Sequence, residues 1–415
     1  MAITSAELKF KKSIVSDDTS NNGARIHNDD VSSLYFPDVT SMERQAGLTR
    51  YRKLFLKNEN NTAGLVGLTL TSAKAWLKRP TPAGVYGSAS NNEYFLLKAG
   101  SDTDIQSGAS AYTNWSGVGY LNAASYSAGA TSIAVVCEPA AGSTSFRTTG
   151  IAFIGYYDTA GNLTVGEFVT VSNMTSSGNI ATLTISALLN TYAQYETNSQ
   201  KLDASIYSST TIGKAASAWS VNAFQNQYVL IYGGTGIGQM RKVASNTADT
   251  ITVDYAWNTT PDATSDFMVL KTYVSMCEDL ASIVCSHGTI TVTSPTGGTF
   301  NTAYFYDYPI GAVTESWTIT FGATSGDYTV TGNNYYGVVA TGNISAGIKP
   351  SNSGSGSYYF EMAAAGFGGT FGAGETITFT TTNSAKGFWA KETIVAGTLP
   401  HSANKVEIMV SGDTA

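Results

Sequence analysis

Three glycines after a short apolar segment have the residue types of a phosphate-binding loop. The apolar residues are 228–232, and Gly234, Gly236 and Gly238 follow them. A dinucleotide-binding loop has the spacing G-x-G-x-x-G and opens a helix whose amide groups face the pyrophosphate. Here the spacing is G-x-G-x-G, and residues 240–244 are typical of a strand. We therefore predict a hairpin loop that uses the positive φ of glycine, and no nucleotide or other cofactor.

Cys285 and His287 are the closest approach to a nucleophile beside a base. Nucleophilic catalysis needs a three-dimensional arrangement of thiol, imidazole and orienting group, which two neighbours along a strand do not provide. A buried structural cysteine is the favoured interpretation. The three histidines are too scattered for a zinc site, and three cysteines are too few for a disulfide framework, although a bridge between Cys277 and Cys285 remains possible.

Acidic residues could serve as a general acid and base for glycoside cleavage, but the sequence does not reveal their separation in space. The available carboxylates are Glu278, Asp279, Asp307 and Glu315. Nothing distinguishes them from surface acids, so we expect no catalytic activity and no metal site. The acidic segment 262–266 lacks the spacing of a calcium-binding hand and is expected to be a solvated turn.

Basic residues are concentrated near the start of the chain. Residues 1–100 have a net charge of +4 and the remaining 315 residues a net charge of −11. We expect Arg50, Arg52, Lys53 and Lys57 to form a solvated face, with an interface to an acidic neighbour as the alternative. The acidic majority of the chain argues against nucleic-acid binding.

Tyrosines are concentrated in the last third of the chain, where Tyr304, Tyr306 and Tyr308 alternate. Alternating aromatic residues more often form a sheet core or cross-strand pairs than a binding surface. Exposed tyrosines also suit sugar stacking and protein contacts, so these three remain candidates for contact with a glycan or a partner.

The elements that position these residues are mainly strands. Glycine- and polar-rich turns separate short runs with a period of two, such as Ile251 and Val253. We predict a mainly β fold of several small antiparallel sandwich-like or barrel-like modules, with short helices at 41–46 and 275–285 and a flexible segment at 351–357. The expected domains are residues 1–105, 106–200, 201–272 and 273–415.

One internal similarity links the two ends of the chain. Trp76 and Trp389 each follow a Ser-Ala-Lys triplet and precede an Ala-Gly pair at the same spacing. Duplication and membership of a shared sheet would both explain it, as would chance in a compositionally biased chain. The N-terminus lacks a signal-peptide pattern, and no apolar run approaches the length of about 18 residues needed to span a membrane. We expect a protein made in the cytoplasm that does not enter a membrane.

Three stretches resemble virion structural proteins of tailed bacteriophages and prophages. They are SAELKFKKS with LYFPDVTSMERQAGLTRYRKLFLKN, IYGGTGIGQMRKVASNTADTITVDYAWNTTPDATS, and ITFTTTNSAKGFWAKETIVAG. The resemblance covers both ends and the middle but not residues 273–375. It implies a non-catalytic tail, baseplate or neck component that forms a homo-oligomeric ring with other virion proteins. The alternatives are a receptor-binding or carbohydrate-binding fibre or decoration protein that contacts host glycan, and a polysaccharide-degrading enzyme.

Overall fold

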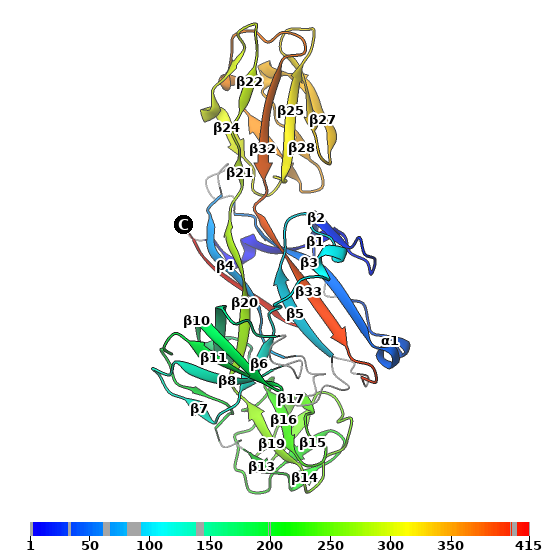
Figure 1. Cartoon of the computed structure of the whole chain (residues 1–415), viewed down its shortest axis with the longest axis vertical. Coiled ribbons are helices and arrows are strands. Elements are labelled where there is room, and N and C mark those ends of the chain that lie inside the picture. The colour runs from blue at the N-terminus through cyan, green and yellow to red at the C-terminus, as the bar shows by residue number, and fades with distance from the viewer. Residues whose placement is uncertain are drawn as a thin grey trace.

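The computed structural model describes residues 3–31, 35–60, 67–80, 93–137, 145–197, 199, 201–398, 400 and 405–414. Within them the chain is mainly β, as predicted, with antiparallel sheets and two short α-helices, α1 (Ser41–Ala46) and α2 (Gln106–Ala109). The body is elongated, with a central sandwich, one module at one end and two at the other (Figure 1). The helix predicted at 41–46 is confirmed, and Gly47 ends it with a φ of 79°.

The central sandwich is built from both ends of the chain. Its first sheet has the order β2-β1-β3-β33-β5, and its second includes β34-β4-β20. In chain order these strands are β1 (Leu8–Val15), β2 (Gly23–Asp30), β3 (Leu48–Asn58), β4 (Leu70–Leu77), β5 (Glu93–Ala99), β20 (Tyr273–Ile283), β33 (Ala385–Ile394) and β34 (Ile408–Thr414). Leu54, Leu97 and Phe388 from the first sheet join Ala75, Leu77 and Leu280 from the second in one buried core. Alternate residues of each strand therefore face the partner sheet.

The two sheets of the sandwich have equivalent strand orders. One sheet contains β3-β33-β5 and the other β20-β4-β34. In this comparison β3 corresponds to β20, β33 corresponds to β4, and β5 corresponds to β34. Trp76 on β4 and Trp389 on β33 then occupy matching central positions, each on the side of its sheet away from the shared core. This arrangement favours internal duplication as the origin of the Ser-Ala-Lys similarity.

A closed six-stranded barrel adjoins the second sheet. Its strands are β6 (Val118–Leu121), β8 (Ser132–Cys137), β9 (Gly150–Tyr157), β10 (Leu163–Ser177), β11 (Ile180–Ile185) and the first half of β20. Closure is complete because β20 pairs with both β6 and β9. Val135, Val171 and Leu183 fill the interior. Since the second half of β20 pairs with β4, this strand ties the barrel to the sandwich.

A seven-stranded sheet forms the second module at this end. Its strands are β13 (Leu202–Asp203), β14 (Ile206–Tyr207), β15 (Thr211–Gly213), β16 (Tyr228–Gly233), β17 (Met240–Asn246), β18 (Thr250–Val253) and β19 (Asp266–Leu270). Val229 and Ile231 of β16 point into the module's own core, whereas Tyr228 and Leu230 pack against the sandwich. β16 is apolar without alternation because both of its faces are buried.

The opposite end carries a tyrosine-rich module. Its main sheet contains β21 (Ser286–His287), β22 (Thr291–Thr293), β25 (Glu315–Phe321), β26 (Asp327–Gly332), β27 (Gly337–Asn343) and β32 (Thr376–Thr382). Three two-stranded pairs accompany it: β23 (Thr299–Phe300) with β31 (Phe367–Gly368), β24 (Phe305–Asp307) with β30 (Phe360–Met362), and β28 (Ser351–Asn352) with β29 (Ser357–Tyr358). Trp317, Phe360 and Phe379 lie at the centre of its core.

Several expectations differ from the structure. The helix predicted at 275–285 is wrong, because those residues lie mainly in β20, which is apolar enough to be buried in two sheets. Residues 351–357 form a tight hairpin between β28 and β29. The expected segment 273–415 is divided, since β20, β33 and β34 belong to the sandwich and only the residues between β20 and β33 build the distal module. The sequence pattern of a strand does not reveal which strand it pairs with, so the domain boundary could not be placed from the pattern.

Candidate functional site

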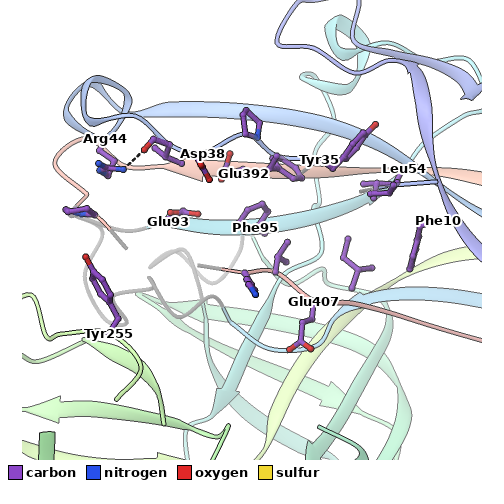
Figure 2. Close-up of a pocket in the computed structure, with 18 residues that line it drawn as sticks. Phe10, Tyr35, Asp38, Arg44, Leu54, Glu93, Phe95, Tyr255, Glu392 and Glu407 are labelled. Atoms are coloured by element: carbon purple, nitrogen blue, oxygen red, sulfur yellow. Dashed lines mark hydrogen bonds between the residues drawn. The ribbon is translucent and has the colours of Figure 1, made fainter. Parts of the chain in front are cut away.

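A cavity of about 820 Å³ lies where the two sheets of the sandwich diverge, close to α1 (Figure 2). Phe10, Leu54 and Phe95 provide apolar walls from the first sheet, and Ile408 borders the cavity from β34. Charged side chains also line the cavity. They are four carboxylates, Asp38, Glu93, Glu392 and Glu407, and two basic groups, Arg44 and Lys405. The cavity can therefore accommodate a ligand with an apolar part and a charged part.

A short row of charged side chains crosses the sheet at this cavity. Arg50 on β3 lies directly opposite Glu392 on β33, and Glu93 on β5 is the diagonal neighbour of Glu392. All three belong to the side of the sheet that further along carries Leu54, Phe388 and Leu97 of the core. The row thus continues the inward-facing side of the sheet, and its members Glu93 and Glu392 line the cavity.

Glu93 and Glu392 form a buried carboxyl pair. Their residues are 8% and 2% exposed, and both side chains line the cavity. Burial and the neighbouring charge of Glu93 raise the pKa of Glu392 to about 8, although Arg50 opposes the shift. Two buried carboxyl groups this close favour retention of one proton, which a hydrogen bond between them accommodates.

The guanidinium group of Arg50 contacts three carboxylates. Its nitrogen atoms lie 2.6 Å from Glu43, 3.4 Å from Glu392 and 3.9 Å from Asp18. Asp18 is closer to Arg52, at 2.7 Å. Two guanidinium groups thus meet four carboxyl groups here when Glu93 is included. With all four carboxyl groups ionised the net charge of this cluster is −2, and one retained proton reduces it to −1.

The candidate interface residues Arg50, Arg52, Lys53 and Lys57 are buried, with exposures between 0% and 4%. The expectation of a solvated face or an exposed docking patch at these positions is therefore wrong. Long basic side chains of β3 instead reach carboxylates and carbonyl groups within the same chain. The sequence pattern did not reveal this because their main partners come from distant segments such as β33, residue 104 and residue 310.

Lys53 points to the opposite face of the sheet, where it meets Asp104. The ammonium group lies 2.5 Å from the Asp104 carboxylate, which also accepts hydrogen bonds from the Trp389 indole at 2.8 Å and the Tyr112 hydroxyl at 2.5 Å. Burial lowers the pKa of Lys53, and the hydrogen bond to Asp104 partly offsets this. Every member of this group has an opposite charge or a hydrogen-bond acceptor, which is the arrangement of a structural buried ion pair.

Lys57 lies at the junction between the sandwich and the distal module. Its ammonium group donates to the carbonyl oxygen of Ile310 at 2.5 Å. Burial lowers the pKa of Lys57 to about 8, and the charge of Glu59 only partly compensates. A lysine that is this buried and weakly paired costs free energy in its charged form, so its stability contribution depends on pH.

The three candidate tyrosines mainly serve packing and internal hydrogen bonds. Tyr304 and Tyr306 are half-buried, and Tyr308 is buried and donates to Glu361. Lys349 lies over the rings of Tyr308 and Tyr358, 5.1 and 4.4 Å from their centroids. Of these residues Tyr358 is the one with a substantially exposed ring, at 37%.

The glycine loop joins β16 to β17 as an antiparallel hairpin, which confirms the predicted geometry. Gly234, Gly236 and Gly238 have φ values of 69°, 83° and 88°. A side chain at Gly234 would place its Cβ 1.7 Å from the carbonyl oxygen of Thr264. Asp262, in the acidic segment 262–266, accepts a hydrogen bond from the loop hydroxyl of Thr235 at 2.8 Å. Glycine is therefore required here for close packing of two turns.

The residues considered for catalysis have separate structural partners. Burial raises the pKa of the Cys285 thiol, and all three cysteines are unbridged, so the Cys277–Cys285 bridge is not formed. His287 contacts Asp307 at 2.9 Å. The carboxylate of Glu278 accepts from Ser116 and Arg147. These contacts stabilise the joints between strands.

Two further carboxylates have similar structural roles. Glu315 accepts backbone hydrogen bonds from Asn334 and Tyr335, and exposed Asp279 accepts one from the backbone of Ala281. Within the described ranges, no group of three or more His, Cys, Asp or Glu side chains could hold a metal ion.

Sequence reasoning did not identify the Glu93–Glu392 pair. The two residues lie on strands from opposite ends of the chain, and neither belongs to a recognisable motif. The Ser-Ala-Lys similarity is the one signal that points toward the strand containing Glu392.

Comparison with models of known protein families finds no match, and comparison with curated proteins finds no significant match. In the part of the chain that the structure describes, no helix is sufficiently long and apolar to cross a membrane.

Proposed function

We propose that the chain is a non-catalytic structural component of a tailed-phage virion, in the tail, baseplate or neck, that acts through multi-copy ring assembly. The principal support is its architecture, in which separately cored β modules extend from both ends of one sandwich. Such a body presents a large surface to neighbours along its whole length (Figure 1). The resemblance of the terminal and central sequences to virion proteins favours the same role.

Unpaired strand edges also support an assembly role. Among the described residues, β34 pairs with β4 alone and β27 with β26 alone, and β2 pairs with β1 and, at Gly23, with Ile105. Exposed strand edges are templates for pairing with another chain unless they are protected. Val338 on β27 and Met42 on α1 add exposed apolar side chains. Repeated contacts of this kind close into a ring when the rotation between copies closes.

Immunogold labelling of purified particles tests this proposal. Antibodies against the distal module are applied to particles produced from the genome that encodes the chain. Labelling of several copies at one level of the tail, baseplate or neck is expected. Complete particles that lack the chain by both labelling and mass spectrometry would refute the proposal.

A second candidate function is glycan binding by a fibre or decoration protein. The observation that favours it is the exposed ring of Tyr358 beside Lys349, whose ammonium group is held 2.8 Å from Glu361. An aromatic face beside polar groups suits sugar stacking. A glycan array with Tyr358→Ala tests it, and Tyr335→Ala is the control because Tyr335 is an exposed tyrosine on the same module. Binding lost in the first variant and retained in the second is expected.

A further inference from the structure

We propose that the cavity beside Glu93 and Glu392 receives a lysine or arginine side chain from a neighbouring polypeptide. The partner's identity rests on the proposed assembly role, whereas the binding chemistry rests on this chain alone. Figure 2 shows Glu93, Glu392 and Phe95 bordering the same space. An apolar wall that ends at two carboxyl groups complements an aliphatic stem that ends in a cation.

Charge complementarity is the first argument for a cationic occupant. Four carboxylates and two basic groups line the cavity. Of the basic groups, Arg44 donates a hydrogen bond to the carbonyl oxygen of Val39, and Lys405 is exposed. The guanidinium group of Arg50 lies 2.6 Å from Glu43 and 3.4 Å from Glu392, so its closer contact is with Glu43. An additional cation would therefore meet an acidic environment.

The carboxyl pair is distinct from the other acids of the cavity. Glu407 is half-exposed and lies 3.1 Å from Lys78 and 3.7 Å from Arg79, so its charge is already compensated. Its carboxylate points away from Glu93 in Figure 2. Glu93 and Glu392 are buried, and burial together with the charge of Glu93 raises the pKa of Glu392, which favours a proton on the pair. A partner ammonium or guanidinium group placed beside the pair would favour the ionised form of both carboxyl groups and release such a proton.

The shape of the cavity favours a polypeptide side chain over a small free amine. Its volume of about 820 Å³ exceeds what one side chain occupies, which leaves space for the backbone and neighbouring residues of an extended segment. β34, which among the described strands pairs only with β4, borders the same space through Ile408. An extended segment could pair with this edge while its basic side chain reaches the carboxyl pair.

Calorimetry with two matched peptides tests the proposal on the full chain. The probes are acetyl-Val-Lys-Val-amide and acetyl-Val-norleucine-Val-amide, which differ in the ammonium group. We expect the lysine peptide to bind at least about tenfold more tightly. At pH 7 its binding should release about one proton, detected as a heat that depends on the ionisation enthalpy of the buffer.

Variants locate the effect within the cavity. Glu392→Gln and Glu93→Gln should each abolish the preference for lysine over norleucine. Glu407→Gln is the matched control, because this residue lines the same cavity but is paired with Lys78 and Arg79, and it should retain the preference. If Glu392→Gln does not fold, the wild-type peptide comparison and the proton release decide alone.

Three outcomes would overturn the proposal: equal affinity for the two peptides, absence of binding by the lysine peptide, or tighter binding of cadaverine than of the lysine peptide. The last would indicate a small-amine site. These measurements use the isolated chain, so a negative result is distinguishable from failure of the virion role, which immunogold labelling tests separately.

Discussion

The two faces of the first sheet bury charge in different ways. On the outer face, Lys53 meets Asp104, and neutral donors from Tyr112 and Trp389 complete the carboxylate's hydrogen bonds. On the inner face, Arg50 is shared among carboxylates, and Glu93 and Glu392 border a cavity. Residues on opposite faces of β3 thus contribute to a structural cluster around one ion pair and to a carboxyl-rich cluster that borders a cavity. The comparison teaches that a buried charged cluster identifies a candidate site only where it also borders a cavity.

The largest expected effect comes from removing the centre of the outer cluster. Asp104→Ala should lower the free energy of unfolding by about 3–5 kcal/mol, because it leaves the buried Lys53 ammonium without its carboxylate. Urea denaturation followed by circular dichroism measures the change. Asp102→Ala is the matched control, since the contact of Asp102 with Thr314 is 3.5 Å long. An equal loss in both variants would contradict the assigned role of Asp104.

The inner cluster should be recognised by its pH dependence. The pKa of Glu392 is raised to about 8 in the folded chain, above its unfolded value, so the folded state holds a proton that the unfolded state has lost. The contribution of Glu392 to stability is therefore full below about pH 4.5 and decreases by up to about 1.4 kcal/mol per pH unit as pH rises toward 8. Denaturation curves for the wild type and Glu392→Gln between pH 5 and 8 measure this difference. Parallel pH dependences would contradict the assignment.

Lys57, which is buried outside the cavity and donates to a backbone carbonyl group, should also make stability depend on pH. Its folded pKa of about 8 lies below the unfolded value, so the unfolded chain binds more protons between about pH 8 and 10.5. Stability should rise with pH in this window by about 3 kcal/mol in the wild type relative to Lys57→Met. Lys9→Met is the control, because Lys9 lies directly opposite Lys57 on β1 and is less buried. Equal pH dependence in wild type and Lys57→Met would refute this expectation.

The smallest effect concerns one neutral donor of the outer cluster. Tyr112→Phe removes the hydroxyl that donates to Asp104 and should lower the free energy of unfolding by about 1 kcal/mol. Lys53 and Trp389 continue to compensate the carboxylate in this variant. Thermal denaturation measures the loss, and a decrease as large as that of Asp104→Ala would show that the cluster depends on the hydroxyl more than on the ion pair.

The sequence allowed the strands to be predicted but not their distant partners. Alternation in residues such as Ile251 and Val253, and the apolar run at Tyr228, located β18 and β16 of the seven-stranded sheet. The basic pattern of Arg50 and Lys53 was misread as a surface, because the strand pattern does not reveal that Glu392 and Asp104, far away in sequence, lie beside them. Apolar density in β20 was similarly misread as a helix.

The internal similarity around Trp76 and Trp389 extends to the strands that carry the site. Beyond the two tryptophans, residues 93–102 read EYFLLKAGSD and residues 406–413 read VEIMVSGD, which extends the internal similarity to β5 and β34. A duplicated pair of strands that exchange places between two sheets would bring β5 beside β33, and hence Glu93 close to Glu392. The cavity itself depends on where two sheets diverge, which no local pattern encodes.

The most direct test of the carboxyl-rich cluster at the cavity is a side-chain titration of Glu392. Carbon-13 NMR of the labelled carboxyl group, assigned with Glu392→Gln, reports its protonation in the intact chain. The structure predicts a midpoint near pH 8 that falls when Glu93 is replaced by Gln or when the lysine peptide binds. A midpoint close to the ordinary glutamate value of about 4.3, unchanged by either treatment, would contradict the account.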